Sequence, residues 1–356
     1  MSMIADKTVF KLAYKKAFKP MIIIGLSSLS YGVLAQTFQI QDFSDDYYAV
    51  INTIDDEGYE SNSVISIIDS KTKQTLIRQP SSIDIKYELA DSQQHQLDKK
   101  ISANIVNAPY GEHSVLIYDD FNFDQQKDIA LKDGNYGCYG GPSYQVYLKE
   151  GDNFVHSAGF TDLTQGYCGF FGIDKETQTL NTMTKSGAAW HQYSEYKVID
   201  NEPVAVHIIE EEYNSKGLIS IKESTRVKGK MQVENYEVLP PYVEQATEVS
   251  PPYIYRLIVD NEKQMVLNSY YKDGGEQLYY AFADEEDRIE LLYEGSFVYD
   301  KAKKTLSFTN RPVVYQINDK GITVKLPNQT VLLKAQPNSA RGSLDNLDRF
   351  ENVRIR

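Results

Sequence analysis

A short stretch of the sequence alternates oxygen-bearing side chains at a spacing that could wrap a metal ion. Residues 120–128 read DFNFDQQKD, which places carboxylate or amide oxygens at positions 1, 3, 5 and 9 and a main-chain carbonyl at position 7. A hard cation such as Ca²⁺ takes six to eight oxygen ligands, and water can complete the shell. The pattern therefore predicts a calcium site with these ligands: Asp120, Asn122, Asp124, Gln126 and Asp128.

The same stretch departs from a helix–loop–helix calcium motif in two places. Position 6 is Gln125, where a sharp turn favours glycine, and position 12 is Leu131, where that motif has a bidentate glutamate. β-Branched and aliphatic runs flank the segment, which predicts strands on both sides. The alternative is a solvated acidic turn whose Asp and Asn side chains cap their own backbone.

Two loops rich in glycine and aromatic residues follow, and they have the composition of a binding surface. The first, residues 133–147, reads DGNYGCYGGPSYQVY, and the second, residues 166–171, reads GYCGFF. Tyrosines on such loops supply large contact areas at little entropic cost. We expect Tyr136 and Tyr139 to contact a partner; the alternative is that these rings cover the edge of a core.

Each loop carries one of the two cysteines, Cys138 and Cys168. An exported chain with two cysteines predicts one disulfide, and buried free thiols are the alternative. In the chain-entropy model, closing a loop of about 30 residues stabilises a fold by about 3 to 4 kcal/mol.

A third segment, residues 186–193, reads SGAAWHQY and holds the only tryptophan. We expect Trp190, His191 and Tyr193 to belong to the binding surface, with His191 as a hydrogen-bonding neighbour. Ser186 with His191 could indicate hydrolysis, but the chain has neither a G-x-S-x-G nor an H-E-x-x-H motif. A packed or hydrogen-bonded histidine is the more common outcome.

The elements that position these residues should be strands, because hairpin patterns recur along the chain from residue 36 onward. Each pattern consists of two β-branched or aromatic runs around a short polar turn, and the 27 tyrosines suit half-buried sheet surfaces. The predicted turns lie at residues 70–73, 151–153, 200–201, 260–262 and 318–321. We therefore predict an all-β fold.

The domain organisation follows from a break in this pattern. Residues 229–252 are polar and contain Pro240, Pro241, Pro251 and Pro252, which a central strand would exclude. We predict a propeller-like β domain over residues 36–228, a proline-rich linker over 229–252 and a smaller β domain of unknown role over 253–356. Val353 and Ile355 near the C-terminus could add one edge strand.

The first 35 residues have the three parts of a cleavable signal peptide. Five lysines precede an apolar run from Met21 to Leu34, which is too short for a permanent membrane helix of about 20 residues. Val33 and Ala35 are the small residues that predict cleavage between Ala35 and Gln36. We expect a periplasmic protein with no membrane association after cleavage; the alternatives are an uncleaved membrane anchor and a buried core helix.

The charge of the chain restricts its partners. Residues 1–35 carry five lysines and one aspartate, so their removal changes the formal charge from −13 to −17. Such a charge excludes nucleic acid as an expected partner and favours cationic proteins or divalent metal.

The order of several segments resembles a known family. These segments are residues 120–128, 144–148, 171–180 (FGIDKETQTL), 186–196 and 203–211. Over about residues 115–212 the chain is similar to FG-GAP/VCBS-type β-propeller-like proteins. Among these it most resembles the periplasmic lysozyme inhibitors that include the immunity proteins of antibacterial type IV secretion effectors. The resemblance implies a calcium loop at 120–128 and a role in blocking peptidoglycan hydrolases.

Together these observations predict a non-enzymatic periplasmic inhibitor or immunity protein. Its partner would be a cell-wall hydrolase or a secreted antibacterial effector, bound by the aromatic loops and steered by charge. Two alternatives stay open: a hydrolase of envelope polymers, and a calcium-stabilised adhesive or structural β module.

Overall fold

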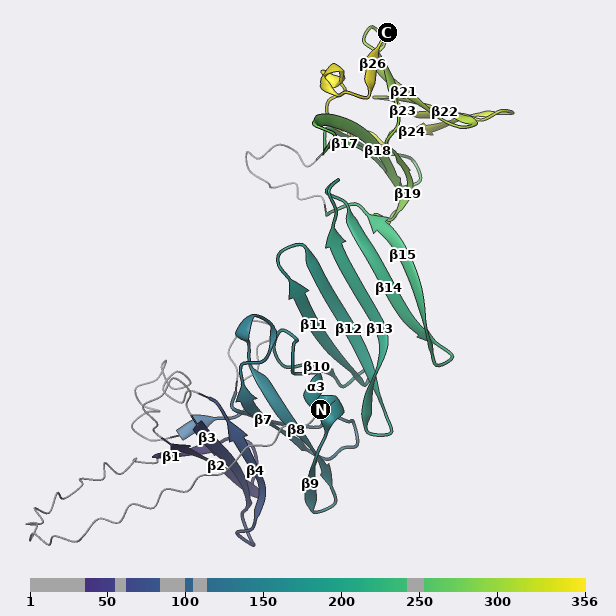
Figure 1. Cartoon of the computed structure of the whole chain (residues 1–356). Coiled ribbons are helices and arrows are strands. Elements are labelled where there is room, and N and C mark those ends of the chain that lie inside the picture. The colour runs from purple at the N-terminus through teal and green to yellow at the C-terminus, as the bar shows by residue number, and fades with distance from the viewer. Residues whose placement is uncertain (1–35, 55–61, 84–99, 105–113, 242–252) are drawn as a thin grey trace, which may run out of the picture.

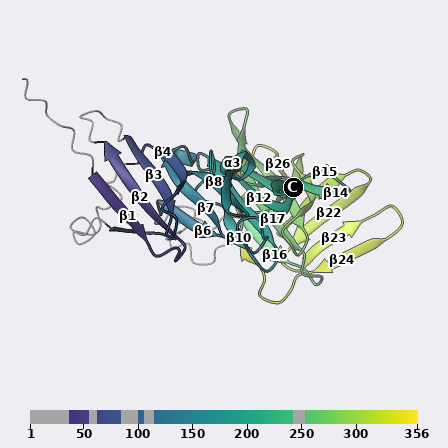
Figure 2. The ribbon, with the colours of Figure 1, turned by 90° about the horizontal axis from the view of Figure 1, so that it is seen from below.

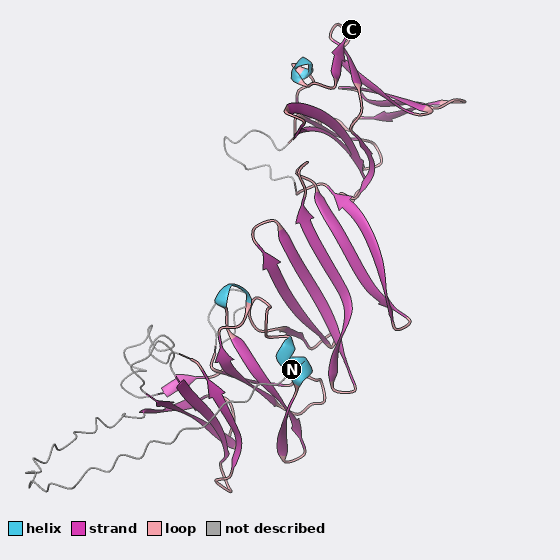
Figure 3. Ribbon diagram, in the orientation of Figure 1, coloured by secondary structure: helices cyan, strands magenta, loops and turns pink. Residues whose placement is uncertain are grey.

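The computed structural model describes residues 36–54, 62–83, 100–104, 114–241 and 253–356. The predicted signal peptide and part of the predicted linker lie outside these ranges. The described chain is nearly all β, as expected, with one short α-helix and two 3₁₀ turns (Figure 3). Its strands form five separate sheets, and none of the sheets formed by described residues closes on itself. The all-β prediction is confirmed, whereas the propeller detail is not.

The first sheet has five strands in the order β4-β3-β2-β1-β5. Strands β1 to β4 form a meander, and β5 is added at its edge, parallel to β1. The strands are β1 (Gln36–Gln41), β2 (Tyr47–Ile54), β3 (Asn62–Asp69), β4 (Thr75–Ser81) and β5 (Lys100–Ser102).

The second sheet has four strands in sequence order, and the loop that contains Cys138 connects two of them. Its strands are β6 (Leu116–Asp119), β7 (Asp128–Gly134), β8 (Ser143–Glu150) and β9 (Asn153–His156). A 3₁₀ turn, η1 (Cys138–Gly140), lies between β7 and β8, and α3 (Ala158–Asp162) follows β9. Ile40 and Leu131 belong to the core that the first two sheets share.

The third sheet is a six-stranded antiparallel meander and contains most of the residues discussed below. Its strands are β10 (Gly172–Asp174), β11 (Thr179–Ser186), β12 (Trp190–Ile199), β13 (Glu202–Tyr213), β14 (Ile219–Val227) and β15 (Lys230–Val238). The predicted linker, residues 229–252, therefore begins too early, because β15 occupies its first part. Residues 230–238 pair with β14 along their whole length, and their β-branched and aromatic residues Val233, Tyr236 and Val238 favour a strand.

The last two sheets share one core. The fourth has the order β19-β18-β17-β16-β25 and the fifth β24-β23-β22-β21-β20-β26, with β26 parallel to β20 at its edge, as predicted for Val353 and Ile355. Phe297 and Leu306 are fully buried in the core between them. The strands are β16 (Tyr255–Ile258), β17 (Gln264–Lys272), β18 (Gly275–Ala283), β19 (Ile289–Tyr293), β20 (Phe297–Asp300), β21 (Thr305–Asn310), β22 (Val313–Asn318), β23 (Gly321–Lys325), β24 (Thr330–Lys334), β25 (Arg341–Gly342) and β26 (Val353–Ile355), with the 3₁₀ turn η2 (Leu347–Arg349) before β26.

The third sheet lies between the first two sheets and the last two (Figures 1 and 2). It contributes to a hydrophobic core only near its ends, through Leu180 and Tyr196 at one end and Leu218 at the other. Most side chains of β13 are half-buried on both faces. The middle of this sheet is therefore a single layer whose two faces are both available for binding.

All five predicted hairpins are present. The turns at residues 70–73, 151–153, 200–201, 260–262 and 318–321 join β3 to β4, β8 to β9, β12 to β13, β16 to β17 and β22 to β23. Asp200 and Asn201 both have positive φ, the conformation that two-residue hairpin turns require and that Asp and Asn tolerate best. None of the described helices has the length and apolar content to cross a membrane.

Candidate binding surfaces

The two cysteine-bearing loops are joined as predicted. Cys138 and Cys168 form a disulfide with a Cα–Cα distance of 4.8 Å. The backbone of the two loops is also paired, because Cys138 donates its amide hydrogen to Tyr167 O at 2.8 Å and Gly166 donates to Tyr136 O at 3.0 Å. At Gly137 an added Cβ would lie 2.9 Å from the carbonyl oxygen of Tyr167, so only glycine allows the two backbones to approach this closely.

The tyrosines of the first loop project from this rigid base. Tyr136 is 63% exposed and Tyr139 is 67% exposed. Tyr139 has left-handed backbone angles, φ 53° and ψ 30°, which are unfavourable for a residue with a side chain. The amide of Gly187 donates to the Tyr139 hydroxyl at 2.6 Å, and the Lys185 ammonium lies 5.2 Å from the ring centroid. The ring is therefore exposed yet held against the β11–β12 turn.

The other three predicted binding residues do not share one surface. Trp190, His191 and Tyr193 lie on β12, where successive side chains point to opposite faces of the sheet. In the pairing register, Trp190 lies between Ser186 and Glu212, whereas His191 lies between Lys185 and Glu211. The sheet therefore separates Trp190 from His191 and Tyr193. It also places Ser186 and His191 on opposite faces, so these two side chains do not form a Ser–His pair.

The Trp190 face carries an acidic hollow of about 390 Å³. Glu210, Glu212 and Glu237 line it together with Trp190, and its one lysine, Lys222, forms an ion pair with Glu210 at 2.6 Å. Glu237 accepts a hydrogen bond from the Asn214 amide. The hollow therefore carries negative charge next to the ring of Trp190.

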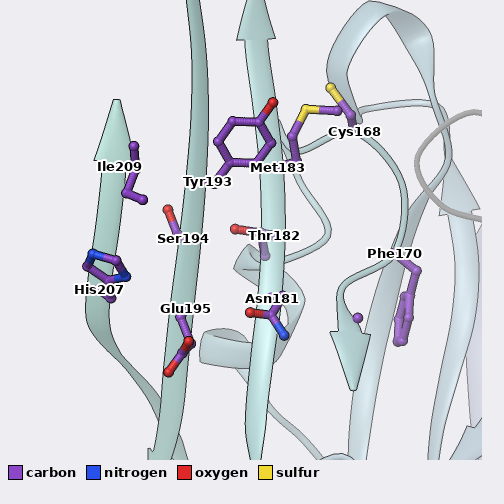
Figure 4. A pocket seen from close by; sticks show the side chains of 11 residues that line it. Cys168, Phe170, Asn181, Thr182, Met183, Tyr193, Ser194, Glu195, His207 and Ile209 are labelled. Atoms are coloured by element: carbon purple, nitrogen blue, oxygen red, sulfur yellow. The ribbon is translucent and has the colours of Figure 1, made fainter. Parts of the chain in front are cut away.

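The opposite face carries a larger pocket of about 470 Å³, which lies over β10 to β13 beside the disulfide (Figure 4). Figure 4 shows its two parts: Met183, Tyr193 and Ile209 form an apolar group, and Asn181, Glu195 and His207 form a polar row across three neighbouring strands. The lining residues are Cys168, Phe170, Gly172, Asn181, Thr182, Met183, Tyr193, Ser194, Glu195, His207 and Ile209.

Two histidine–glutamate pairs flank this pocket. His207 Nε2 lies 2.7 Å from Oε1 of Glu223, and the Tyr236 hydroxyl donates to the other carboxylate oxygen at 2.9 Å. These two hydrogen bonds hold the pKa of Glu223 below its ordinary value. His191 Nδ1 lies 3.6 Å from Glu211, and its ring stacks beside Tyr193 with 6.5 Å between centroids.

Of the residues that line this pocket, the sequence predicted Tyr193 as a binding residue and Cys168 as a disulfide residue, but it did not predict Glu195, His207 or Ile209. The sequence indicates part of the pairing of β12 with β13, because the two-residue turn at 200–201 fixes where their register starts. The register then shifts by one at a β-bulge between Glu195 and Tyr196. Without that shift Val206, not His207, would lie opposite Glu195.

The proposed calcium loop uses its oxygens to bind its own backbone. Asp120 accepts hydrogen bonds from the amides of Asp124 and Gln125, at 3.1 and 2.9 Å. Asp124 accepts from the Gln126 amide, and Asn122 donates its side-chain amide to Asn201. Gln125 has φ 71°, so the sharp turn expected of glycine is present despite the side chain.

Asp128 is fully buried beneath this loop. Its two oxygens accept hydrogen bonds from the amides of Phe121 and Lys149, at 2.7 and 2.8 Å. Burial, together with the charges of Asp124 and Asp120, raises the pKa of Asp128 to about 7 despite these bonds. Within the described ranges no group of three acidic, histidine or cysteine side chains is placed to hold a metal ion. The present arrangement fits a self-capped turn better than a coordination shell, and calcium binding stays a prediction.

Fold and surfaces together define an all-β, disulfide-containing protein with an exposed aromatic loop and a two-faced central sheet. No family model and no curated protein matches the chain, so the FG-GAP/VCBS resemblance stays a prediction.

Among solved structures, a type IV secretion system related protein from Xanthomonas is similar at 17% identity, over 56% of this chain and 92% of that chain, with a TM-score of 0.42. An uncharacterized protein from Listeria monocytogenes is similar at 10% identity, over 86% of this chain and 85% of that chain, with a TM-score of 0.23. At these TM-scores the function has to be argued from the residues of the chain itself.

Proposed function

We propose that the protein is an exported inhibitor that binds a cationic cell-wall hydrolase, such as a lysozyme-like effector, and blocks its cleft with the loop around η1. The observation that carries the proposal is the pair Tyr136 and Tyr139, both more than 60% exposed on a loop held by a disulfide. Aromatic side chains that are already ordered bind with a small entropic penalty and often supply most of an interface's energy.

The rigidity of the loop supports insertion into a cleft. The disulfide and two backbone hydrogen bonds join the loop to residues 166–168, and the Gly187–Tyr139 hydrogen bond joins it to the β11–β12 turn. Tyr139 itself has a backbone conformation that is unfavourable for a residue with a side chain. Such conformations are concentrated at functional sites.

The charge of the chain supports a cationic partner. From residue 36 onward the formal charge is −17, and carboxylates line the hollow beside Trp190. Opposite charges on two proteins accelerate their association and disfavour acidic partners.

The experiment is a turbidity assay of peptidoglycan lysis with a panel of lysozyme-like and amidase enzymes, each with and without the protein. We expect at least one cationic enzyme to be inhibited. Tyr136→Ala and Tyr139→Ala should each weaken inhibition by about thirtyfold, the effect of losing a binding anchor. Tyr271→Ala is the matched control, because Tyr271 is 79% exposed on a sheet remote in sequence from the loop.

Three outcomes separate the candidate functions. Inhibition that is lost in the two loop variants and kept in the control supports the proposal. Lysis by the protein alone would replace the inhibitor with the envelope hydrolase. If the protein neither inhibits nor lyses, the calcium-stabilised adhesive module becomes the better description.

A further inference from the structure

The pocket over β10 to β13 contains an ionisable side chain that has no part in the proposed insertion of the aromatic loop. Glu195 lies in the polar row between Asn181 and His207. Its carboxylate forms no hydrogen bond or ion pair with any residue that the structure describes. A β-bulge lies between Glu195 and Tyr196, and β-bulges commonly redirect a neighbouring side chain. An unpaired carboxylate in a hollow is a ready acceptor for a cation.

The rest of the pocket suits a long side chain with an apolar stem. Met183, Tyr193 and Ile209 lie in one row across three strands, next to the row of Glu195. Tyr193 is 45% exposed, so its ring presents a surface for stacking. Methylene groups can pack on these side chains while a charged head reaches Glu195.

The electrostatics of this face favour a positive head group. Among the eleven lining residues one is an acid and none is a lysine or arginine. Glu223 and Glu211 carry further negative charge next to the two histidines. Lys185 lies on the same face of the sheet, opposite His191, and its ammonium lies over the Tyr139 ring.

We propose that this pocket binds an arginine side chain of the protein partner, with the guanidinium paired to Glu195 and stacked on Tyr193, and the stem packed on Met183 and Ile209. Arginine is favoured over lysine because its planar group can stack on a ring and form two hydrogen bonds with a carboxylate at once. The proposal rests on the inhibitor function and adds a second contact on the sheet, separate from the aromatic loop.

Methionine methyl groups provide a direct test on the full chain. Of the six methionines, three lie in the described part: Met183 lines the pocket, Met231 lies on the opposite face of the sheet, and Met265 is buried in the C-terminal core. With ¹³C-methyl methionine, N-acetyl-arginine amide should shift the Met183 signal in a saturable manner and leave Met231 and Met265 unchanged. N-acetyl-citrulline amide has the same shape without the charge and should shift nothing.

Substitutions test the role of each side chain. Glu195→Gln should weaken binding of the arginine derivative at least fivefold, because the charged hydrogen bond is lost. Glu212→Gln makes the same change on the other face of the sheet and should leave binding unchanged. Tyr193→Leu should weaken binding while keeping the pocket apolar. A Met183 signal that does not respond to the arginine derivative overturns the proposal, and so does a response to N-acetylglucosamine alone, which would indicate a sugar pocket.

The lysis assay keeps the two proposals distinguishable. If Glu195→Gln inhibits as well as the wild type while Tyr139→Ala does not, the arginine pocket is wrong and the inhibitor function stands. If no hydrolase is inhibited but the arginine derivative still binds at Met183, the inhibitor function fails and the chemistry of the pocket stands.

Discussion

The hydroxyl oxygen of Tyr139 accepts a hydrogen bond from the backbone amide of Gly187, 48 residues further along the chain. The contact joins the loop around η1 to the turn between β11 and β12. It orders the ring that is expected to enter a partner.

Tyr139→Phe isolates this ordering effect, because it keeps the ring and removes the acceptor oxygen. We expect faster hydrogen exchange at the Gly187 amide and about fivefold weaker binding to the inhibited hydrolase, since one hydrogen bond contributes about 1 kcal/mol. Mass spectrometry of deuterium uptake measures the first effect without any partner. Tyr136→Phe is the control, and equal uptake at Gly187 in both variants would contradict the ordering role.

Removal of the disulfide should destabilise the whole loop region. Cys138 and Cys168 are 30 residues apart, so a double substitution to serine should lower the free energy of unfolding by about 3 to 4 kcal/mol in the chain-entropy model. Chemical denaturation of the oxidised wild type and of the variant measures the difference. Equal midpoints for the two proteins would show that the backbone hydrogen bonds hold the loops without the disulfide.

Calcium should raise the melting temperature if residues 120–128 bind it. A ligand that binds only the folded state stabilises it by about 2.7 kcal/mol at a concentration one hundred times its Kd. Asp124→Ala should abolish the rise, while Asp152→Ala, an acidic turn residue elsewhere, should retain it. Identical melting in calcium and in chelator would leave the self-capped turn as the full account of this segment.

Asp128 should make stability depend on pH when calcium is absent. Its pKa in the folded chain is about 7, compared with an ordinary value of 3.8, so the fold favours the protonated carboxyl. This contribution is fully present below pH 3.8 and is lost as the pH rises through 7.

The matched variant for this effect is Asp128→Asn, which cannot ionise. The stability of the wild type relative to this variant should fall between pH 4 and pH 8 by up to about 4 kcal/mol. Urea denaturation in chelator across this range measures the difference. A constant difference would show that the two backbone hydrogen bonds to Asp128 outweigh its burial.

Export should leave a chain that begins at Gln36, because Val33 and Ala35 satisfy the small-residue requirement of signal cleavage. Intact mass of protein recovered from the periplasm measures this. Ala35→Asp should block processing, and Gln36→Asn should not. Protein that retains residues 1–35 in the membrane fraction would favour the uncleaved anchor.

Much of the local structure could be predicted from the sequence, because it depends on residues that are close together in the chain. The Asp200–Asn201 turn joins β12 to β13 since these two residue types tolerate positive φ, and the flanking alternation requires strands. The two cysteines could pair only with each other within the chain, and they do. The strand β15 could not be predicted from the residues alone, because Pro240 and Pro241 follow it directly and prolines indicate a break in a sheet.

The sequence by itself thus determined the all-β class, the hairpins and the disulfide, whereas the tertiary structure decided which side chains share a surface. Trp190 and Tyr193 are three residues apart, yet β12 presents them on opposite faces because side chains alternate along a strand. Glu195 and His207 are neighbours only because a bulge shifts the register by one residue. A bulge depends on packing against neighbouring strands as well as on local propensity, so the polar row of the pocket became evident only in the folded chain.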